Sequence, residues 1–170
     1  MIFIAADHAG FHLKKQLIQY LEVKGYKVED CGANVLDEAD DYPDFIIPCA
    51  QKVALRPIRG AQGKQAQDKP DDLGIVIGGS GQGEAICANK VKGIRAAIYN
   101  GGDAKMIGKL AKEHNNANVL SLGARLISTD DAKKAVTAWL DAKFEGGRHE
   151  KRLQKIEKIE KVEMDKKNNG

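Results

Sequence analysis

The chain has 170 residues, of which 42% are hydrophobic and 30% are charged, and its formal net charge is +3. That length is most simply one domain, and that composition is ordinary for a soluble globular protein. The small net charge gives no case for a nucleic-acid partner. No apolar run approaches the ~20 residues of a membrane span. The N-terminus also lacks the basic and apolar regions of a secretory signal.

Cysteine usage indicates a reducing compartment. Cys31, Cys49 and Cys87 are widely spaced and form no CxxC pair. An odd number of such residues fits reduced thiols, so we expect a cytoplasmic protein. No group of histidine, cysteine and acidic residues has the spacing of metal ligands. We therefore expect neither a metal nor a cofactor.

Apolar runs and helical periodicities alternate along the chain. The first run, 2–6, predicts a strand, and leucines at helical spacing predict a helix over 11–24 that Gly25 ends. The same reasoning predicts further strands at 26–31, 73–77, 94–99 and 118–122. It predicts further helices at 43–54, which Pro43 opens, and at 84–91, 103–114 and 129–143, the last capped by Ser128.

Strand–helix units in series indicate an α/β fold with three layers, in which a five-stranded parallel sheet of Rossmann-like type is covered by helices on both faces. Ligands of such folds bind beyond the carboxyl ends of the strands, at the topological switch point. We expect the common strand order 2-1-3-4-5. That order makes strands one and three neighbours, so the loop after residue 6 lies beside the loop after residue 77.

Two segments depart from this pattern. Residues 56–72 contain two prolines, two glycines and three glutamines, which favours an extended surface loop, with a functional lid as the alternative. The C-terminal part, 151–170, is rich in Lys and Glu, with Leu153, Ile156, Ile159 and Val162 at every third position. It predicts a helical tail that follows a single α/β domain over 1–150. Its apolar stripe would fit a groove on this chain or on a partner.

The most informative stretch is 73–84, which predicts a buried strand, a glycine-rich loop and a carboxylate at the start of a helix. Its glycines let the backbone approach a ligand closely, and the N–H groups of the following helix favour an anion. Glu84 is an acid beside that loop. The combination indicates an enzyme that holds a negatively charged intermediate and moves a proton next to it. Neither a GK[ST] ending nor full GxGxxG spacing is present, which argues against nucleotide loops of those kinds.

Further polar candidates follow other elements of the predicted fold. Asp7 and His8 come directly after the first strand, although Asp7 by itself could be a cap of the next helix. His114 and Asn115 close the helix over 103–114. A histidine there is favoured by the helix dipole, and it is also a plausible general acid or base near neutral pH.

Three arginines form another group. Arg125 follows the fifth strand, and Arg148 and Arg152 lie four residues apart, on one helical face. Such a pair can hold a phosphate through charge-assisted hydrogen bonds. A solvated basic helix explains the same spacing.

Together, these stretches carry a resemblance that covers residues 1 to about 153. The chain resembles the type B ribose-5-phosphate isomerases, in the wider family that includes galactose-6-phosphate isomerase subunits. The matching stretches are Ala6-Asp-His-Ala-Gly-Phe11 with Leu13-Lys14, Asp41-Tyr-Pro43, Gly78-Gly-Ser-Gly-Gln-Gly-Glu84, Ala88-Asn-Lys90, Gly93-Ile-Arg95, His114-Asn-Asn116 with Asn118-Val119, Gly123-Ala-Arg125 and Glu145-Gly-Gly-Arg-His149.

The resemblance implies interconversion of ribose 5-phosphate and ribulose 5-phosphate through an enediolate, without a metal. It implies that His114 helps to open the sugar ring. It assigns the remaining substrate contacts to Asp7, His8, Tyr42, Asn115, the anion-binding loop residues Gly79, Ser80, Gly81, Gln82 and Gly83, and the phosphate-binding Arg125, Arg148 and Arg152. Family members are dimers or tetramers with shared sites, so a homodimer or homotetramer is expected.

One departure concerns the base. Many members carry a cysteine just before the glycine loop, where this chain has Gly78. Another branch of the family has glycine there and a glutamate after the loop, which makes Glu84 the expected base and Cys87 a packed thiol. Two alternatives stay open: an isomerase of a hexose 6-phosphate of allose or galactose type, and a catalytically silent sugar-phosphate-binding subunit.

Overall fold

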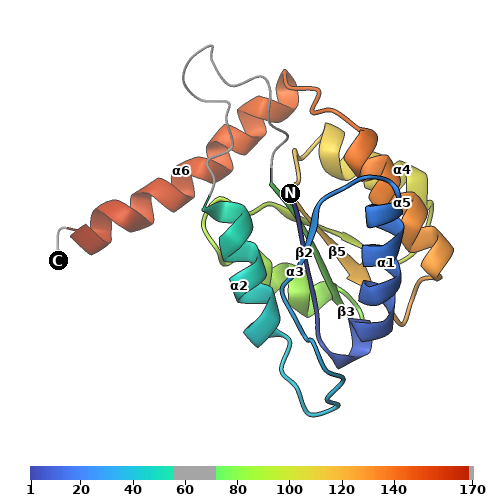
Figure 1. The fold of residues 1–170 in the computed structure, drawn as a ribbon. Helices are drawn as coiled ribbons and strands as arrows, with labels where there is room; N and C mark the ends of the chain where they lie inside the picture. The colour runs from blue at the N-terminus through green and yellow to red at the C-terminus, as the bar shows by residue number, and fades with distance from the viewer. Residues whose placement is uncertain (56–71, 169–170) are drawn as a thin grey trace.

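A five-stranded parallel sheet forms the centre of the molecule in the computed structural model, which describes residues 1–55 and 72–168, the last eight by their backbone alone (Figure 1). Its strands are β1 (Ile2–Ala6), β2 (Val28–Asp30), β3 (Leu73–Gly78), β4 (Ala96–Tyr99) and β5 (Val119–Gly123). The helices are η1 (His8–Gly10, a 3-10 turn), α1 (Phe11–Val23), α2 (Pro43–Ala54), α3 (Gln82–Ala88), α4 (Ala104–Glu113), α5 (Thr129–Asp141) and α6 (Arg148–Asn168). The expected α/β fold with a parallel five-stranded sheet is confirmed.

The sheet has the order β2-β1-β3-β5-β4, so the predicted order 2-1-3-4-5 is wrong for its last two strands. β5 pairs with β3 from Gly74–Val119 to Gly78–Gly123, and β4 lies at the edge. Burial agrees with these places, because every residue of β5 is buried whereas only Tyr99 of β4 is. The neighbouring pair that matters for ligand binding, β1 and β3, is as predicted.

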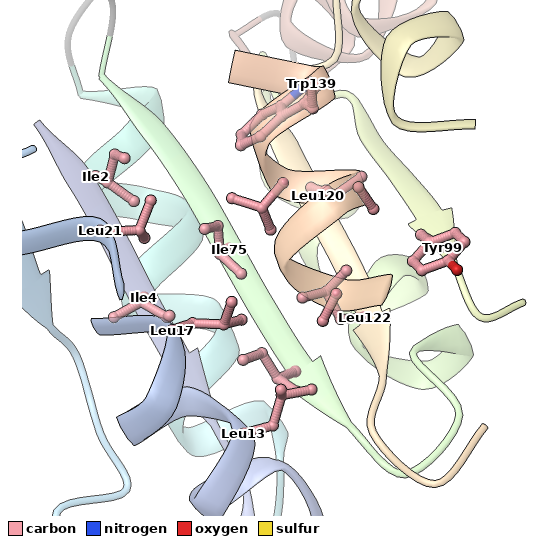
Figure 2. Close-up of a cluster of buried hydrophobic side chains, with 14 of the residues drawn as sticks. Ile2, Ile4, Leu13, Leu17, Leu21, Ile75, Tyr99, Leu120, Leu122 and Trp139 are labelled. Carbon is pink, nitrogen blue, oxygen red and sulfur yellow. The ribbon is translucent and has the colours of Figure 1, made fainter. Parts of the chain in front are cut away.

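Two apolar layers hold the helices against the sheet. On one face, α1 and α5 pack on β1, β3 and β5 through the side chains that Figure 2 labels, among them Leu17, Ile75 and Trp139. The indole N–H of Trp139 donates to the Ala117 carbonyl at 3.1 Å, which satisfies its one polar group. On the other face, α2 and α3 contribute Ile46, Val53 and Ala88, among others, to a smaller cluster with Phe3 and Val76. The burial of both faces explains why the strands are almost wholly apolar.

Several predicted boundaries differ from the structure. β2 is confined to 28–30 and β4 to 96–99, so both predicted strands were too long, and α5 ends at Asp141 rather than at 143. α3 starts two residues before Glu84 and stops at Ala88, well before 91. Ser128 caps α5 as predicted, because its hydroxyl accepts the Asp131 N–H at 3.1 Å. The predicted surface loop over 56–72 lies outside the described residues, except for Asp72.

The C-terminal tail is helical, but α6 starts at Arg148, earlier than the expected boundary (Figure 1). Within the described part of the chain, two residues of its apolar stripe stay open: Ile156 is 53% exposed and Ile159 is 64% exposed. The Glu160 carboxylate accepts the Gly93 N–H at 3.2 Å, so the tail does contact the α3–β4 connection. Among the described residues, no helix is both long and apolar enough to cross a membrane.

A close approach of α4 to α5 makes Gly108 a test of this packing. A Cβ on Gly108 would overlap the backbone carbonyl of Ala135. Gly108→Ala should therefore lower the free energy of unfolding by about 1–3 kcal/mol, because overpacking exceeds the gain in helix propensity. The exposed Lys105 on the same helix supplies the control, since Lys105→Ala should stay within roughly 0.5 kcal/mol. Chemical denaturation measures both, and a Gly108→Ala protein as stable as the parent would contradict the packing.

Candidate active site

The carboxyl group of Glu84 lies buried at the carboxyl end of β3. Glu84 is in the first turn of α3 and is only 4% exposed. Its Oε2 has no hydrogen-bond partner among the described residues. Burial raises the pKa of Glu84 and the negative charge of Asp7 adds to this, whereas backbone groups of Glu84 and Gly81 act in the opposite direction. A buried acid with one free oxygen and a raised pKa is suited to accept and return a proton.

Gly78 provides the space for that carboxyl group. A Cβ at this position would overlap Oε1 and Cδ of Glu84. Any other residue at 78 would therefore push the Glu84 carboxyl out of its place. A cysteine at 78 and this conformation of Glu84 exclude each other sterically, which gives a physical reason for the pairing of glycine before the loop with glutamate after it.

Backbone carbonyls of the glycine loop are held from the sheet side. The buried hydroxyl of Ser121 on β5 donates to the Gly81 carbonyl at 2.6 Å, and the Asn100 amide donates to the Ser80 carbonyl at 3.3 Å. Gly81 has a φ of +76°, which L-residues with side chains rarely adopt. Its carbonyl also accepts the Ala85 N–H at 3.1 Å. These contacts fix the loop carbonyls on the protein side, and of the loop N–H groups that of Gln82 donates to Ser80 Oγ at 3.3 Å.

Two side chains lie against the glycines of this loop. The Arg125 guanidinium would be 3.3 Å from a Cβ on Gly79, and the Tyr42 ring would be 3.0 Å from one on Gly83. Tyr42 is the residue before α2, and Arg125 follows β5. Larger residues at 79 and 83 would meet these side chains, so the glycines allow an arginine and a tyrosine to border the loop.

Asp7 and His8 reach the same place from β1. The Asp7 carboxylate caps η1, because it accepts the N–H groups of Ala9 and Gly10 at 3.0 and 3.2 Å. The capping role considered for Asp7 is therefore real, and it coexists with the electrostatic effect on Glu84. His8 Nδ1 lies 2.7 Å from Oδ1 of Asp40. We call the group Asp7, His8, Asp40, Tyr42, Glu84, Arg125 and loop residues 79–83 the strand-end cluster.

A second group, the helix-end cluster, consists of His114, Glu145, Arg148 and His149. The two imidazole rings stack with centroids 4.2 Å apart. Oε2 of Glu145 lies 3.9 Å from His114 Nε2 and 3.8 Å from His149 Nε2, and Arg148 Nε donates to His149 Nε2 at 3.3 Å. Burial lowers the pKa of His149, and the positive charges of its neighbours add to this.

The two clusters lie at opposite ends of the strands: one at their carboxyl ends and the other at their amino ends. The strand-end cluster follows the carboxyl ends of β1, β3 and β5, whereas His114 ends α4, which runs back to the amino end of β5. α6 accordingly starts at the amino ends of the strands, away from α3 (Figure 1). A strand of five residues separates its carboxyl end from its amino end by about 16 Å. Of the predicted site residues, His114, Asn115, Arg148 and Arg152 therefore do not join Glu84 within one chain.

Asn115 and Arg152 are both exposed near the helix-end cluster. The Asn115 carbonyl accepts Arg95 Nε at 3.2 Å, and Arg152 lies one turn along α6 from Arg148. Sequence reasoning did not identify Asp40, Ser121 or Asn100 as parts of the site, and it did not identify the roles of Glu145 and His149. The last two lie in the stretch 145–149 that supports the family resemblance, so a signal for them existed. Nothing in the pattern around Asp40 distinguishes it from the neighbouring acids.

Two groups in the described residues bring potential metal-binding atoms within 4.8 Å of one another: His114, Glu145 and His149, and Asp7, His8 and Asp40. Linear spacing had indicated neither. In the first, Arg148 is hydrogen-bonded to the ring nitrogen of His149 and places a positive charge beside the donors. In the second, the donors bind one another and backbone N–H groups. In both groups, the candidate metal-binding atoms therefore already have hydrogen-bond or ion-pair partners.

The fold and the strand-end cluster define an α/β protein with a buried acid and a glycine-rich loop at its switch point. Residues 2–156 match the family described as Ribose/Galactose Isomerase. The probable ribose-5-phosphate isomerase B of Mycoplasma genitalium is 44% identical over 155 residues, which are 91% of this chain and 92% of that protein. The chain belongs to the ribose/galactose isomerase family, which confirms the resemblance seen in the sequence.

Solved structures agree. The crystal structure of ribose-5-phosphate isomerase B from Mycoplasma genitalium with bound ribulose-5-phosphate is 42% identical, with a TM-score of 0.81, and the match covers 94% of this chain and 95% of that one. The ribose-5-phosphate isomerase B of Clostridium thermocellum has a TM-score of 0.81 at 40% identity, with coverages of 95% and 97%. In sequence, the ribose-5-phosphate isomerase B of Mycolicibacterium paratuberculosis is 39% identical over 89% of this chain and 86% of that protein.

The buried carboxyl of Glu84 should cost stability at neutral pH. Its pKa is raised in the folded state, so the folded protein binds more protons than the unfolded chain, and stability falls as the pH rises from the unfolded to the folded pKa. Glu84→Gln removes this loss. The variant should unfold at a higher temperature than the parent at pH 7–8, and the difference should shrink toward zero near pH 4.

Thermal unfolding at several pH values measures this effect. Glu38→Gln is the control, because Glu38 is exposed and makes the same change of charge. A Glu84→Gln protein that is less stable than the parent at pH 8 would contradict the assignment.

Proposed function

We propose that this chain interconverts ribose 5-phosphate and ribulose 5-phosphate, with Glu84 as the acid–base group. The observation that carries the proposal is the buried, unpartnered Oε2 of Glu84 beside a glycine loop whose carbonyls are bound away from the ligand. The bound ribulose-5-phosphate of the Mycoplasma genitalium relative supports the choice of a pentose phosphate.

The proposed reaction moves one proton from C2 to C1 through Glu84 and one hydroxyl proton from O2 to O1. The Glu84 carboxylate takes the proton from C2 of the open-chain aldose, the C1 carbonyl becomes an enediolate oxygen, and the same carboxyl returns the proton to C1. The hydroxyl proton moves from O2 to O1, which leaves the ketone at C2. Loop N–H groups 79–83 stabilise the enediolate, and one such donor typically contributes about 3 kcal/mol to the transition state.

A complete site on this proposal needs a second copy of the chain. A substrate of five carbons and one phosphate, at about 1.5 Å per bond, is shorter than the distance between the carboxyl and amino ends of the strands. His114, Asn115, Arg148 and Arg152 would therefore serve the strand-end cluster of a neighbouring subunit in a homodimer or homotetramer. Exposed Ile156 and Ile159 on α6 support assembly, because a partner would cover them.

The charges of the helix-end cluster suit the phosphate end of the substrate. Arg148 and Arg152 are exposed and four residues apart, and burial together with the neighbouring positive charges lowers the pKa of His149. Arg125 would bind at the other side of the substrate, near Gly79. The free thiols of all three cysteines fit a cytoplasmic reaction.

Replacement of the base tests the chemistry. Glu84→Gln should lower kcat at least ~100-fold with a small change in KM, because it removes the proton acceptor and keeps the polar contacts. Gly78→Ala should do the same by displacing the carboxyl. A coupled assay with ribose 5-phosphate measures both, and allose 6-phosphate in the same assay tests the hexose alternative.

Cys87→Ser is the matched control for that pair. Cys87 lies one turn along α3 and burial raises its pKa, so it should be dispensable. Turnover should also survive prolonged treatment with EDTA. An active Glu84→Gln protein together with an inactive Cys87→Ser protein would reject Glu84 as the base, and a parent without turnover of any sugar phosphate would favour the silent binding subunit.

Mixed assemblies test the shared site. Glu84→Gln damages the strand-end cluster and Arg148→Ala the helix-end cluster, so a mixed dimer of the two contains one intact site. Co-refolding of the two variants should recover about one quarter of parental activity, since half of randomly formed dimers are mixed and half of their sites are intact. Glu84→Gln mixed with Gly78→Ala should recover nothing. An equal lack of recovery in both mixtures, with mixed dimers isolated by two tags, would reject a shared site.

A further inference from the structure

The carboxylate of Asp40 binds His8 twice. Oδ1 of Asp40 accepts the backbone N–H of His8 at 3.0 Å and lies 2.7 Å from Nδ1 of its ring. The two residues are 32 positions apart, so the contact is created by the fold and not by a local turn. Asp40 precedes Tyr42, whose ring lies against Gly83, so one loop delivers both side chains to the strand-end cluster.

Burial of Asp40 is costly for a residue that would only hold a loop. Its side chain is 8% exposed, and Oδ2 is buried without a hydrogen-bond partner among the described residues. A carboxylate with an unsatisfied buried oxygen loses free energy relative to a solvated one. Most other acids of this loop, Asp37, Glu38 and Asp41, are exposed.

This contact decides which ring nitrogen of His8 can meet a ligand. A carboxylate accepts hydrogen bonds and does not donate them, so the short contact requires a proton on Nδ1. Nε2 is then the nitrogen that remains for a ligand. The His8 side chain is 27% exposed, so the ring is held by Asp40 and is still partly accessible.

The two carboxylates near His8 favour the protonated form of its ring. The hydrogen bond to Asp40 raises the pKa of His8 and is the largest influence, and the charge of Asp7 adds to it. Partial burial and the charge of Arg125 act in the opposite direction. Asp7 acts on the ring from the end of β1, Asp40 from the loop before α2 and Arg125 from the loop after β5. The imidazolium form therefore persists to higher pH than for a free histidine.

We propose that Asp40 is a positioning residue that fixes His8 with Nδ1–H on the carboxylate and Nε2 toward the bound sugar. In its protonated form, His8 then donates Nε2–H to a hydroxyl or carbonyl oxygen of the substrate. That the substrate is a sugar phosphate rests on the proposed function. The orientation and charge of the ring do not, because they follow from contacts within this chain.

Nitrogen-15 NMR of the histidine rings tests the orientation without any substrate. The chain has 4 histidines, and the spectrum of His8→Gln identifies the signals of His8. In the parent protein, neutral His8 should carry its proton on Nδ1. A neutral ring protonated on Nε2 would overturn the proposal, and this measurement needs no variant of Asp40.

Titration of the same signals tests the charge. Asp40→Asn should lower the pKa of His8, because a neutral amide stabilises the imidazolium less than a carboxylate does. Glu38→Gln makes the same change of charge at an exposed position of the same loop and should leave the pKa of His8 at its parental value. An unchanged pKa in Asp40→Asn, or equal shifts in both variants, would overturn the proposal.

Kinetics separate positioning from a purely structural role. Asp40→Asn should lower kcat/KM by roughly 10–100-fold, the range seen when the partner of a metal-bound histidine is removed. The pH above which activity falls should move down, as the imidazolium is lost earlier. In the His8→Gln background, Asp40→Asn should cost nothing further. A full additional loss there would show that Asp40 acts independently of His8 and would overturn the proposal.

Failure of the proposed function has a different signature. If the parent turns over no sugar phosphate, the kinetic experiment gives no rate for any variant. The two NMR experiments still decide the orientation and the charge of His8. Asp40→Glu is the conservative variant, because it keeps the charge. It should retain more of the raised pKa than Asp40→Asn, and a pKa as low as that of Asp40→Asn would overturn the role of the charge.

Discussion

The steric relation between Gly78 and Glu84 is the constraint on which the rest of the site depends. The carboxyl of Glu84 occupies the volume that any side chain at 78 would need. This is possible because β3 ends in a residue without a Cβ, at the point where the chain turns into the glycine loop. The acid is thereby placed at the end of β3, in a buried position where its pKa is raised. Proton transfer next to a stabilised anion requires such a combination of acid and N–H donors.

The sheet supports this arrangement from below. β5 lies beside β3, and not at the edge, so Ser121 and Gly123 come directly under the loop. The Ser121 hydroxyl holds the Gly81 carbonyl, and a Cβ on Gly123 would meet the Ser80 carbonyl. A strand order with β4 in that place would bring a different set of side chains under the loop. The order of the last two strands is therefore a feature of the site as well as of the fold.

Two buried carboxyl groups carry unfavourable free energy: Glu84 and Asp40 each have a buried oxygen without a partner in the described residues. Both lie in the strand-end cluster. The apolar layers on both faces of the sheet supply the stability against which such groups can be maintained. The helix-end cluster is different, since its two histidine rings stack on each other and its Arg148 is exposed.

The sequence by itself determined the fold class, the family and the placement of Glu84 next to the glycine loop. These follow from local patterns: strand-length apolar runs, helical periodicity, and glycines immediately before an acid, all of which depend on residues close together in the chain. The neighbouring β1 and β3 were also predicted, because that pairing is common to parallel sheets of this type.

Only the tertiary structure decided which distant residues meet. The contact of Asp40 with His8 and the support of Gly81 by Ser121 join residues 32 and 40 positions apart. The separation of His114 from Glu84 depends on the direction in which α4 runs back across the sheet. No local pattern encodes these distances, because they are set by how helices pack on the sheet and by the order of its strands. The exchange of β4 and β5 was missed for the same reason: both orders are compatible with the same local periodicities, and the burial of whole strands against both helix layers selects between them.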